Sequence, residues 1–555
     1  FDLQGHQFAL DLRGEGGLKL SDWWKNGAEA YRATMVPHFP NYFLVTGPNA
    51  GVGTTSIVHL IEQSIGWIVE AIKLTGDALS ISVGEDITRE FNAEIQKELS
   101  QTVWASGCKS WYLTDDGRIE TLFPGNAQAF EAQMASVKLN EVDFYRLEGG
   151  HKTPVDLTQS APAVLNAAKI VEGSFDPAFK SVAEAFEANF AARGEVGASL
   201  CLSVGGTTVL DMWGGVAVPA SKTAWTQDTI VPVFSCTKAA TALCAHVLVD
   251  RGLLDLDAPV AQYWPEFAAN GKEAVTVRML LNHSAGLPAL RSKVEPDGFT
   301  NFDQTAAQLA SEAPFWEPGT RSGYHMITFG WLVGELVRRV SGKSLGQFFH
   351  AEIVGPLGLD FWIGLPQSEE ARLAPSIAFR PDATTPPSEF IKRLMTDPSS
   401  IQFLSFMNSG GFDINKRAYR AAEIGGAGGI ANARALAGMF APLVSGTTLL
   451  SRERINAMRK PSMVTEQDET LLIPTRFGEG FMLSMPNRDL PSGASVRLGE
   501  GAFGHVGMGG SIGFADPEAG LAMGYAMNKQ GAGILLNERG QSLVDAAYAV
   551  VGETV

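Results

Sequence analysis

Between residues 56 and 72, apolar side chains recur with the spacing of one helix face, which predicts a helix. The apolar positions are Ile57, Leu60, Ile61, Ile65, Ile68 and Val69. Upstream of it, residues 39–46 have the pattern of a turn followed by a short strand, and a loop rich in Gly and Pro connects strand and helix. This order predicts a small α/β segment within residues 1–147.

The rest of the chain shows a different alternation of strands and helices. Residues 198–213 predict a hairpin around the glycine pair at 205–206, and residues 521–528 predict a further strand. Long helices are predicted at 237–252, 303–312, 327–341 and 432–444. The pattern indicates an α+β fold, in which an antiparallel sheet is flanked by helices and a helical subdomain is added.

A polar stretch with Pro and Gly at 147–162 predicts a domain boundary. We therefore expect a first domain at 1–147, a linker at 148–164 and a second domain at 165–555. Within the second domain, the Pro- and Ser-rich segment 363–425 predicts a wall or lid over a site. Its residues Phe390, Phe403, Phe406 and Met407 fit either an acyl pocket or ordinary core packing.

Composition excludes several classes of function. The 555 residues carry a net charge of −17, which argues against binding to nucleic acid or to anionic membrane surfaces. No apolar run approaches the roughly 20 residues that span a bilayer. The four cysteines lack paired spacing, which indicates free thiols and a cytoplasmic location, and no metal motif is present. Because residue 1 is Phe rather than Met, we expect the natural chain to begin further upstream.

Ser235 and Lys238 stand at the start of the helix predicted at 237–252. Residues three apart are separated by close to one helical turn, so both side chains lie on one face. An amine beside a hydroxyl activates a serine nucleophile, and the positive end of the helix helps to stabilise an alkoxide. The alternative is that Ser235 only caps the helix. A second Ser-x-x-Lys, at residues 106–109, has no apolar helix after it, so we do not expect catalysis there.

Two other motifs point to catalysis less strongly. Residues 509–513 fit the Gly-x-Ser-x-Gly elbow of α/β-hydrolases, but a turn follows Ser511 where the elbow requires a helix. No histidine lies beyond His505, so a later partner is missing, and we interpret Ser511 as part of a strand pair. We expect His283, at the end of a predicted helix, to be structural rather than a member of a triad.

Two later segments supply residues that fit beside Ser235. Tyr324 follows a tight Pro-Gly turn, and a lysine ammonium nearby would favour its phenolate, so we expect a general base. The alternative is a core tyrosine that packs on the turn. Near the C-terminus, glycines flank a short strand with His505, Gly507 and Met508, where a substrate comes close to the backbone. Backbone N–H groups there complete an oxyanion hole with the N–H of Ser235.

With these motifs in this order, residues from about 165 to 555 resemble the serine β-lactamase-like family, most closely the family VIII carboxylesterases. The resemblance rests on residues 194–198, 213–215, 235–238, 263–267, 281–288, 356–359, 425–429 and 505–507. It implies a β-lactamase/transpeptidase-like fold and a Ser/Lys/Tyr acyl-enzyme mechanism. Carried over to this chain, Ser235 is the nucleophile, Lys238 tunes it and Tyr324 shuttles the proton.

Two departures from the β-lactamase pattern bear on the substrate. The family's Tyr-x-Asn is Tyr324-His325-Met326 here, and its Lys-Thr/Ser-Gly is His505-Val506-Gly507. A neutral histidine attracts a substrate carboxylate poorly, so we expect a carboxylesterase that acts on short-chain or lactone-like esters. The alternatives are a β-lactamase or D-Ala-D-Ala peptidase, and, in another class, a flavin monooxygenase fragment whose β-lactamase-like part is a docking module without activity.

Residues 39–70 and 104–124 resemble the C-terminal part of Baeyer–Villiger flavin monooxygenases. That resemblance implies a truncated oxygenase fused to a hydrolase, because no Gly-x-Gly-x-x-Gly follows a strand here. We therefore expect no cofactor in this chain, with FAD and NADPH bound only if the upstream oxygenase domains are present. The expected ligand is a small ester substrate. A second copy of the chain is also an expected partner, because the truncated first part would expose apolar surface. An oxygenase that makes esters and a hydrolase that cleaves them also suggest coupled reactions.

Overall fold

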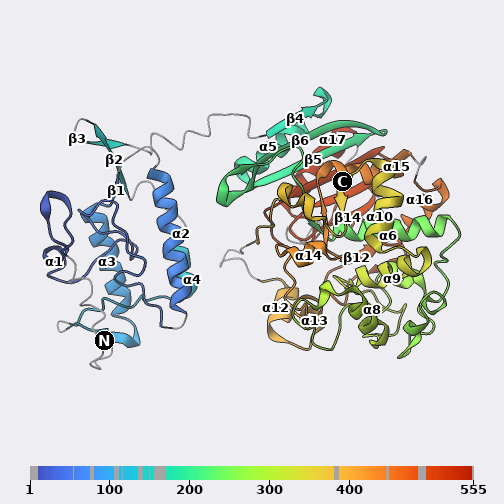
Figure 1. The fold of residues 1–555 in the computed structure, drawn as a ribbon, viewed down its shortest axis with the longest axis horizontal. Helices are drawn as coiled ribbons and strands as arrows, with labels where there is room; N and C mark the ends of the chain where they lie inside the picture. Colours follow the sequence, from blue (N-terminus) through green and yellow to red (C-terminus); the bar gives the residue numbers. More distant parts are fainter. Residues whose placement is uncertain are drawn as a thin grey trace. The chain divides into compact units, whose positions relative to one another are not determined.

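The computed structural model forms two compact units, residues 1–168 and 169–555 (Figure 1). It describes residues 11–53, 56–75, 80–105, 112–114, 117–134, 142–148, 151–155, 171–379, 387–445, 449–485 and 495–552. Most of the linker predicted at 148–164, and the second Ser-x-x-Lys at 106–109, lie outside these ranges. Of the helices within them, none combines the length and apolar character that crossing a bilayer requires.

The first unit contains helices and a small antiparallel sheet of order β1-β2-β3. The predicted helix is present as α2, but the strand predicted at 39–46 is reduced to one bridge between Met35 and Phe43. That prediction was wrong because His38 and Asn41 take left-handed backbone conformations that bend the chain. The elements are α1 (Leu20–Trp23), α2 (Ile57–Thr75), β1 (Ser80–Ser82), α3 (Glu85–Leu99), α4 (Ala127–Gln133), β2 (Asp143–Glu148) and β3 (His151–Val155).

The glycine loop before α2 serves packing within the unit. Gly51 exchanges backbone hydrogen bonds with Thr121 and Phe123, at 2.8 and 2.7 Å. A Cβ at Gly51 would lie 2.6 Å from the Thr121 carbonyl oxygen, and one at Gly53 would lie 3.1 Å from the Trp104 ring. The close approach that these glycines permit is therefore used by Thr121 and Trp104 of the same unit.

Helix α2 is apolar on two sides. One side packs in the unit's core through Leu60, Trp67 and Ala71. The opposite side is exposed, although it too is apolar, and its residues are Ile57, Val58, Ile65, Val69 and Ile72. A stripe of this kind marks a surface that another protein part covers.

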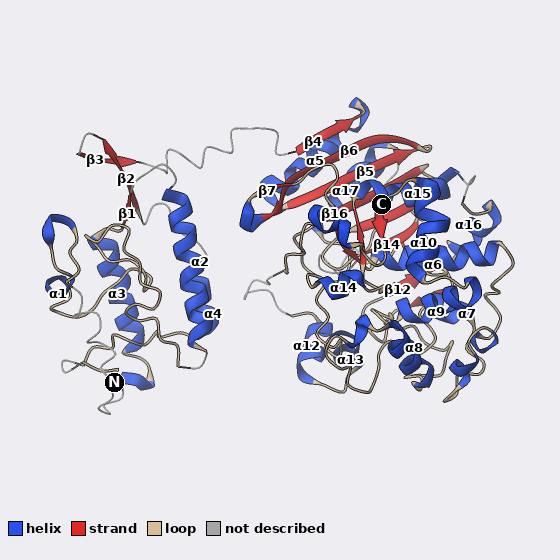
Figure 2. Cartoon of the chain, viewed as in Figure 1, coloured by secondary structure: helices blue, strands red, loops and turns tan. Residues whose placement is uncertain are grey.

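The second unit is built on an antiparallel sheet of order β11-β12-β13-β14-β15-β16-β5-β6-β4, with β7 added on β6 (Figure 2). A smaller sheet, β8-β10-β9, lies beside it. The hairpin predicted around residues 205–206 and the strand predicted at 521–528 are both confirmed. The strands are β4 (Val171–Phe175), β5 (Gly197–Val204), β6 (Thr207–Val218), β7 (Thr223–Ala224), β8 (Val231–Phe234), β9 (Phe361–Trp362), β10 (Gly429–Ala431), β11 (Met463–Thr465), β12 (Thr475–Phe477), β13 (Met482–Leu483), β14 (Phe503–Val506), β15 (Ile512–Asp516) and β16 (Leu521–Met527).

Helices cover both faces of the large sheet. One face packs against α5 and α17, and the other against α15 and α6, beyond which α9 follows (Figure 1). The four long helices predicted from the sequence are confirmed as α6, α8, α9 and α15. The helices are α5 (Lys180–Ala192), α6 (Cys236–Asp250), α7 (Val277–Leu281), α8 (Phe302–Ser311), α9 (Phe329–Ser341), α10 (Leu345–Phe349), α11 (Gly355–Leu357), α12 (Glu389–Thr396), α13 (Ile401–Phe406), α14 (Arg417–Ala421), α15 (Ala433–Ser445), α16 (Arg452–Met458) and α17 (Glu538–Val550).

Strand β16 shows how side-chain size positions these layers. Every residue of the strand is buried, so it alternates in size rather than in polarity. Met523 and Tyr525 point toward α5 and α17, whereas Ala522 and Ala526 point toward α15. At Gly524 a Cβ would lie 2.2 Å from the Ala433 carbonyl oxygen, so only glycine lets α15 approach this closely.

The segment 363–425 forms α12, α13 and α14 with connecting loops, and residues 380–386 lie outside the described ranges. Of the residues considered for an acyl pocket, Phe390 is buried and packs against Phe406 with ring centroids 6.1 Å apart. Phe406 and Met407 are 39% and 51% exposed. Core packing therefore accounts for Phe390, while Phe406 and Met407 form part of the surface.

Candidate active site

Ser235 lies at the sharp turn between β8 and α6. The preceding residue, Phe234, has a φ of 44°, a strained conformation for a residue with a Cβ, and such strain concentrates at functional sites. Ser235 occupies the N-cap position of α6, yet its side chain makes no capping hydrogen bond. The interpretation of Ser235 as a simple N-cap is therefore wrong, because the hydroxyl is directed to another partner.

The next two residues fix the first turn of α6 to neighbouring strands. The Cys236 thiol donates to the His505 carbonyl oxygen of β14 at 3.3 Å. Burial raises the pKa of Cys236 to about 12, so it is an inert thiol. The Thr237 hydroxyl accepts the N–H of Gly429 in β10 at 2.8 Å. The start of α6 is thus held from both sides, which fixes the position of Ser235.

Lys238 is fully buried and makes three polar contacts through Nζ. These are 3.0 Å to Ser235 Oγ, 2.5 Å to the Met326 carbonyl oxygen and 2.7 Å to the Gly426 carbonyl oxygen. Burial lowers the pKa of Lys238 well below its usual value, and no carboxylate among the described residues forms an ion pair with it. In the neutral amine, two N–H groups serve the two carbonyls, so the lone pair is left for the Ser235 hydroxyl. The prediction that both side chains share one helix face is confirmed.

Tyr324 is buried beside this pair. Lys238 Nζ lies 4.7 Å from the centroid of its ring, and its hydroxyl interacts with the Ser235 side chain. Burial raises the pKa of Tyr324 above its usual value, and the interaction with Ser235 offsets only part of that rise. The prediction of an easily formed phenolate is therefore wrong, because burial favours the uncharged phenol and the neutral Lys238 amine carries no charge that would offset it.

Asp468 is a member of the site that the sequence analysis missed. Both of its carboxylate oxygens accept the N–H of Tyr324, at 2.9 and 3.1 Å. It lies in a polar stretch after β11, where nothing in the local sequence distinguishes it from a surface turn residue. Only the fold brings it, fully buried, beneath the tyrosine.

Two buried histidines next to Tyr324 have structural roles. The His283 ring packs edge-on against the Tyr324 ring, with centroids 5.0 Å apart, and its Nδ1 accepts the N–H of His325. His325 donates through Nδ1 to the Gly323 carbonyl oxygen and accepts the N–H of Leu287 at Nε2. Burial lowers the pKa of His325 to about 3, so its ring is neutral. The expectation that His283 is structural agrees with these contacts.

The three residues predicted around the oxyanion hole, His505, Gly507 and Met508, differ in whether their hydrogen-bonding groups are free. The N–H of Gly507 donates to the Ser511 carbonyl oxygen at 2.7 Å, so Gly507 is a wrong prediction for an oxyanion donor. In the part of the chain that the structure describes, the N–H groups of Ser235 and Met508 have no internal acceptor. His505 donates through Nδ1 to the Val506 carbonyl oxygen, and its Nε2 has no partner within the described ranges.

Ser511 directly precedes β15, which pairs with β14. It is fully buried, and its hydroxyl donates to the Val233 carbonyl oxygen at 3.2 Å. A Cβ at Gly507 would lie 2.2 Å from this hydroxyl, so the two residues pack directly together. The interpretation of Ser511 as a strand-pair feature is confirmed.

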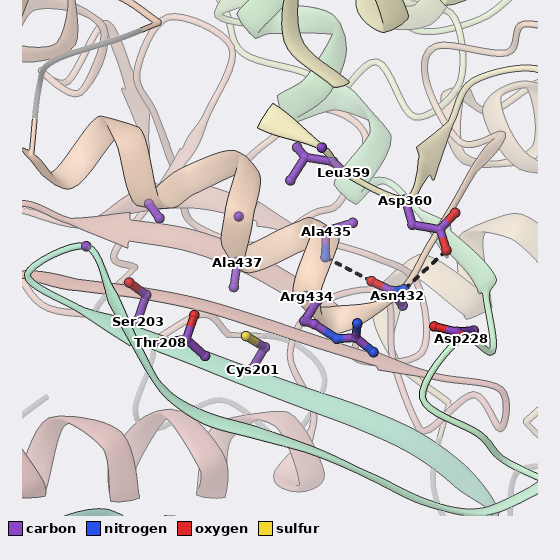
Figure 3. Close-up of a pocket in the computed structure, with 14 residues that line it drawn as sticks. Cys201, Ser203, Thr208, Asp228, Leu359, Asp360, Asn432, Arg434, Ala435 and Ala437 are labelled. Carbon is purple, nitrogen blue, oxygen red and sulfur yellow. Dashed lines mark hydrogen bonds between the residues drawn. The ribbon is translucent and has the colours of Figure 1, made fainter. Parts of the chain in front are cut away.

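A cavity of about 330 Å³ in the second unit is lined by a different set of residues (Figure 3). It is lined by Cys201, Ser203 and Thr208 of the β5–β6 hairpin and by Asn432 and Arg434 at the start of α15. Its lining does not include Ser235, Lys238 or Tyr324. Asn432 accepts the N–H of Ala435 there and so caps α15, which indicates a structural role for at least part of this wall.

Comparison with known proteins places this geometry in a family. The family model described as Beta-lactamase matches residues 182–545, a range that contains Ser235, Lys238, Tyr324 and Asp468. The chain belongs to the beta-lactamase family. Its resemblance at the sequence level to serine β-lactamase-like proteins, and the expected fold of a sheet flanked by helices, are thereby confirmed.

Two similar proteins are named as esterases. The Esterase/beta-lactamase LipL of Mycobacterium tuberculosis is 36% identical over 373 residues, which are 66% of this chain and 84% of LipL. The crystal structure of a family VIII carboxylesterase is 38% identical and superimposes with a TM-score of 0.60, over 68% of this chain and 99% of that protein.

The first unit is similar to a different class of protein. A Baeyer–Villiger monooxygenase of Pseudomonas aeruginosa is 41% identical over 123 residues, which are 21% of this chain. Those residues make up only 23% of the monooxygenase, so the chain spans about a quarter of that relative. The predicted resemblance of the first unit is confirmed, and most of such an oxygenase has no counterpart here.

Proposed function

We propose that the second unit is a serine carboxylesterase that works through an acyl-enzyme on Ser235. The observation that carries the proposal is the 3.0 Å contact between Lys238 Nζ and Ser235 Oγ, with the other two contacts of that amine made to carbonyl oxygens. Only a neutral amine in this arrangement leaves its lone pair for the serine proton. The names of LipL and of the family VIII carboxylesterase support ester substrates.

In the proposed acylation step, Lys238 accepts the Ser235 proton while Oγ attacks the ester carbonyl carbon. The N–H groups of Ser235 and Met508 then stabilise the negative oxygen of the tetrahedral intermediate. As the intermediate collapses, the Tyr324 phenol protonates the departing alkoxide and regains a proton from the Lys238 ammonium. A water molecule then attacks the acyl carbon with Lys238 as its base, and the Lys238 ammonium returns the proton to Ser235 Oγ as the carboxylic acid leaves.

Uncharged esters suit this site better than β-lactams or peptide tails that carry a carboxylate. Burial, together with the positive charge that Lys238 carries when it is protonated, lowers the pKa of His505 to about 3, so this histidine is neutral. A neutral His505 offers Nε2 as a hydrogen-bond acceptor rather than a cation. The test compares kcat/KM for p-nitrophenyl butyrate with that for nitrocefin. A higher value on nitrocefin would favour the β-lactamase alternative, and no turnover of either would favour the non-catalytic docking module.

The pH dependence of ester hydrolysis should report the buried lysine. Lys238 acts only when deprotonated, so activity rises with pH through its pKa, which burial lowers well below the usual 10.5. Tyr324 keeps its proton beyond pH 10, since burial raises its pKa. We expect kcat/KM for p-nitrophenyl butyrate to reach a plateau well below pH 10.5 and to hold it up to at least pH 10. A profile still climbing near pH 10.5, as an ordinary lysine would give, contradicts this assignment.

A coupled role for the first unit follows from its similarity to Baeyer–Villiger monooxygenases. An oxygenase of that class converts a ketone into an ester or lactone, which the second unit would then cleave. We expect no tight flavin binding by this chain itself, since Gly51 and Gly53 are used in packing. Flavin absorbance in the purified chain would contradict that expectation. The coupled role would be contradicted if an oxygenase joined to this chain converted a ketone into an ester and that ester then accumulated.

A further inference from the structure

Asp468 accepts hydrogen bonds from several residues around Tyr324 as well as from Tyr324 itself. Besides the N–H of Tyr324, its carboxylate accepts the N–H groups of Thr470 and Leu471, each at 2.9 Å. The hydroxyls of Ser322 and Thr475 donate to the same carboxylate, at 3.2 and 3.3 Å. Oδ1 accepts all three backbone N–H groups, which cannot accept in turn, and Oδ2 accepts both hydroxyls and shares the N–H of Tyr324, so a carboxylate satisfies all five donors at once.

The segment that follows Asp468 also fixes the tyrosine ring. Phe477, at the end of β12, stacks on the Tyr324 ring with centroids 6.0 Å apart and an angle of 3° between the planes. The N–H of Glu469 donates to the Ser322 carbonyl oxygen at 2.8 Å. Residues 468–477 therefore hold the tyrosine at its backbone and at its ring.

Helix α13 is tied to the same segment. The Gln402 side-chain amide donates to the carbonyl oxygens of Glu469 and Thr470, at 2.7 and 2.8 Å. Gln402 is buried, whereas the same helix ends at the exposed Phe406. The segment that holds Tyr324 is thus anchored against the expected wall of the site.

We propose that Asp468 is the positioning residue that holds Tyr324 in place to protonate the leaving alcohol. This inference rests on the proposed esterase function. Asp468 does not reach the reacting atoms itself; it accepts from the backbone of Tyr324 and so sets where the phenol points. A displacement of about 1 Å at a proton donor costs on the order of 100-fold in rate, which makes this contact measurable.

The charge of Asp468 adds to its geometric role. Burial is the main reason why Tyr324 keeps its proton, and the negative charges of Cys236, when ionised, and of Asp468 act in the same direction. The other titratable groups that face the ring are Lys238, His283 and His505. Removal of the Asp468 charge therefore lowers the pKa of Tyr324, and any loss of activity on the alkaline side moves to lower pH.

The variant Asp468→Asn should impair turnover most when the leaving alcohol needs a proton. Ethyl butyrate releases a strongly basic alkoxide, whereas p-nitrophenyl butyrate releases a phenolate that leaves unprotonated. We expect kcat to fall about 100-fold on ethyl butyrate and about tenfold or less on the p-nitrophenyl ester, with KM changed little. Steady-state kinetics on both esters, with circular dichroism to verify folding, make the measurement.

Asp516→Asn is the matched control. Asp516 is also a buried aspartate that accepts two backbone N–H groups and one hydroxyl, those of Glu518, Ala519 and Tyr548, but it lies at the end of β15 and none of these partners is a residue of the site. It should lower stability without changing the ratio of the two rates. Equal losses on both esters for Asp468→Asn, or no loss, would overturn the inference.

If Asp468→Asn does not fold, Thr475→Val removes one donor to the carboxylate and should change the ratio in the same direction by a few fold. An unchanged ratio in that folded variant would also overturn the inference. The wild type and Ser235→Ala are measured in parallel. If the wild type turns over neither ester, the proposed function is wrong. If the wild type is active and Ser235→Ala is not, the proposed function stands, and the ratio of the rates on the two esters in the Asp468 variant decides the role of Asp468.

Discussion

Replacement of Ser235 by alanine should abolish ester hydrolysis, with kcat on p-nitrophenyl butyrate falling about 10⁴-fold or more. The acyl-enzyme forms on Ser235 Oγ, so its loss leaves only the oxyanion donors and substrate binding to accelerate the reaction. Ser235 is half-buried and makes no capping bond, so the change should leave α6 intact. Kinetics together with an unchanged thermal unfolding midpoint would test this.

Ser511→Ala separates this result from a general loss of structure. Ser511 also lies in a hydrolase-like motif, but its hydroxyl is engaged with the Val233 carbonyl oxygen. We expect the folded Ser511→Ala protein to keep most of the activity of the wild type. Comparable losses in both variants would mean that the assignment of the nucleophile is wrong.

Replacement of Lys238 by methionine should lower kcat by about 10²- to 10⁴-fold, the range typical of a lost general base. Methionine has a similar length but no amine, so Ser235 loses its proton acceptor. KM should change little, because Lys238 is fully buried and its Nζ contacts only Ser235 and two backbone carbonyl oxygens among the described residues. The rise of activity with pH assigned to Lys238 should disappear from the profile of this variant, as measured by initial rates on p-nitrophenyl butyrate across pH.

Lys272→Met is the control for the loss of a buried amine. Lys272 is also buried, and its Nζ donates to two carbonyl oxygens, those of Ala269 and Glu312, at 2.6 and 2.5 Å. Both lysine variants leave carbonyl groups without a donor, so both should lose stability. Only the Lys238 variant should lose catalysis, and an equal loss in the Lys272 variant would point to stability as the cause.

The sequence was most informative where local spacing decides geometry. Ser235 and Lys238 are three residues apart in one helix, so a helical pattern alone brings their side chains together, as the 3.0 Å contact shows. The hairpin at β5–β6 and the long helices followed for the same reason, because they depend on periodicity within a single segment. The turn that follows Ser511 and the lack of a histidine beyond His505 likewise argued against Ser511 as the nucleophile before the fold was known.

Contacts between distant segments explain what the sequence did not reveal. Asp468 reaches Tyr324 from 144 positions further along the chain, and no local pattern predicts that approach. The charge state of Tyr324 was predicted wrongly because a nearby amine is visible in the motif, whereas complete burial is a property of the fold. Gly507 was assigned an open N–H because the turn that joins it to Ser511 forms only when β14 and β15 pair.

The central claim is that Ser235 carries the acyl group. Mass spectrometry after treatment with a fluorophosphonate tests it most directly, since trypsin separates the two candidate serines into peptides 223–238 and 498–529. The account predicts one adduct, on Ser235 in peptide 223–238, that is absent from Ser235→Ala. An adduct on Ser511, or unmodified peptide 223–238 from a protein that the reagent has inactivated, would contradict it.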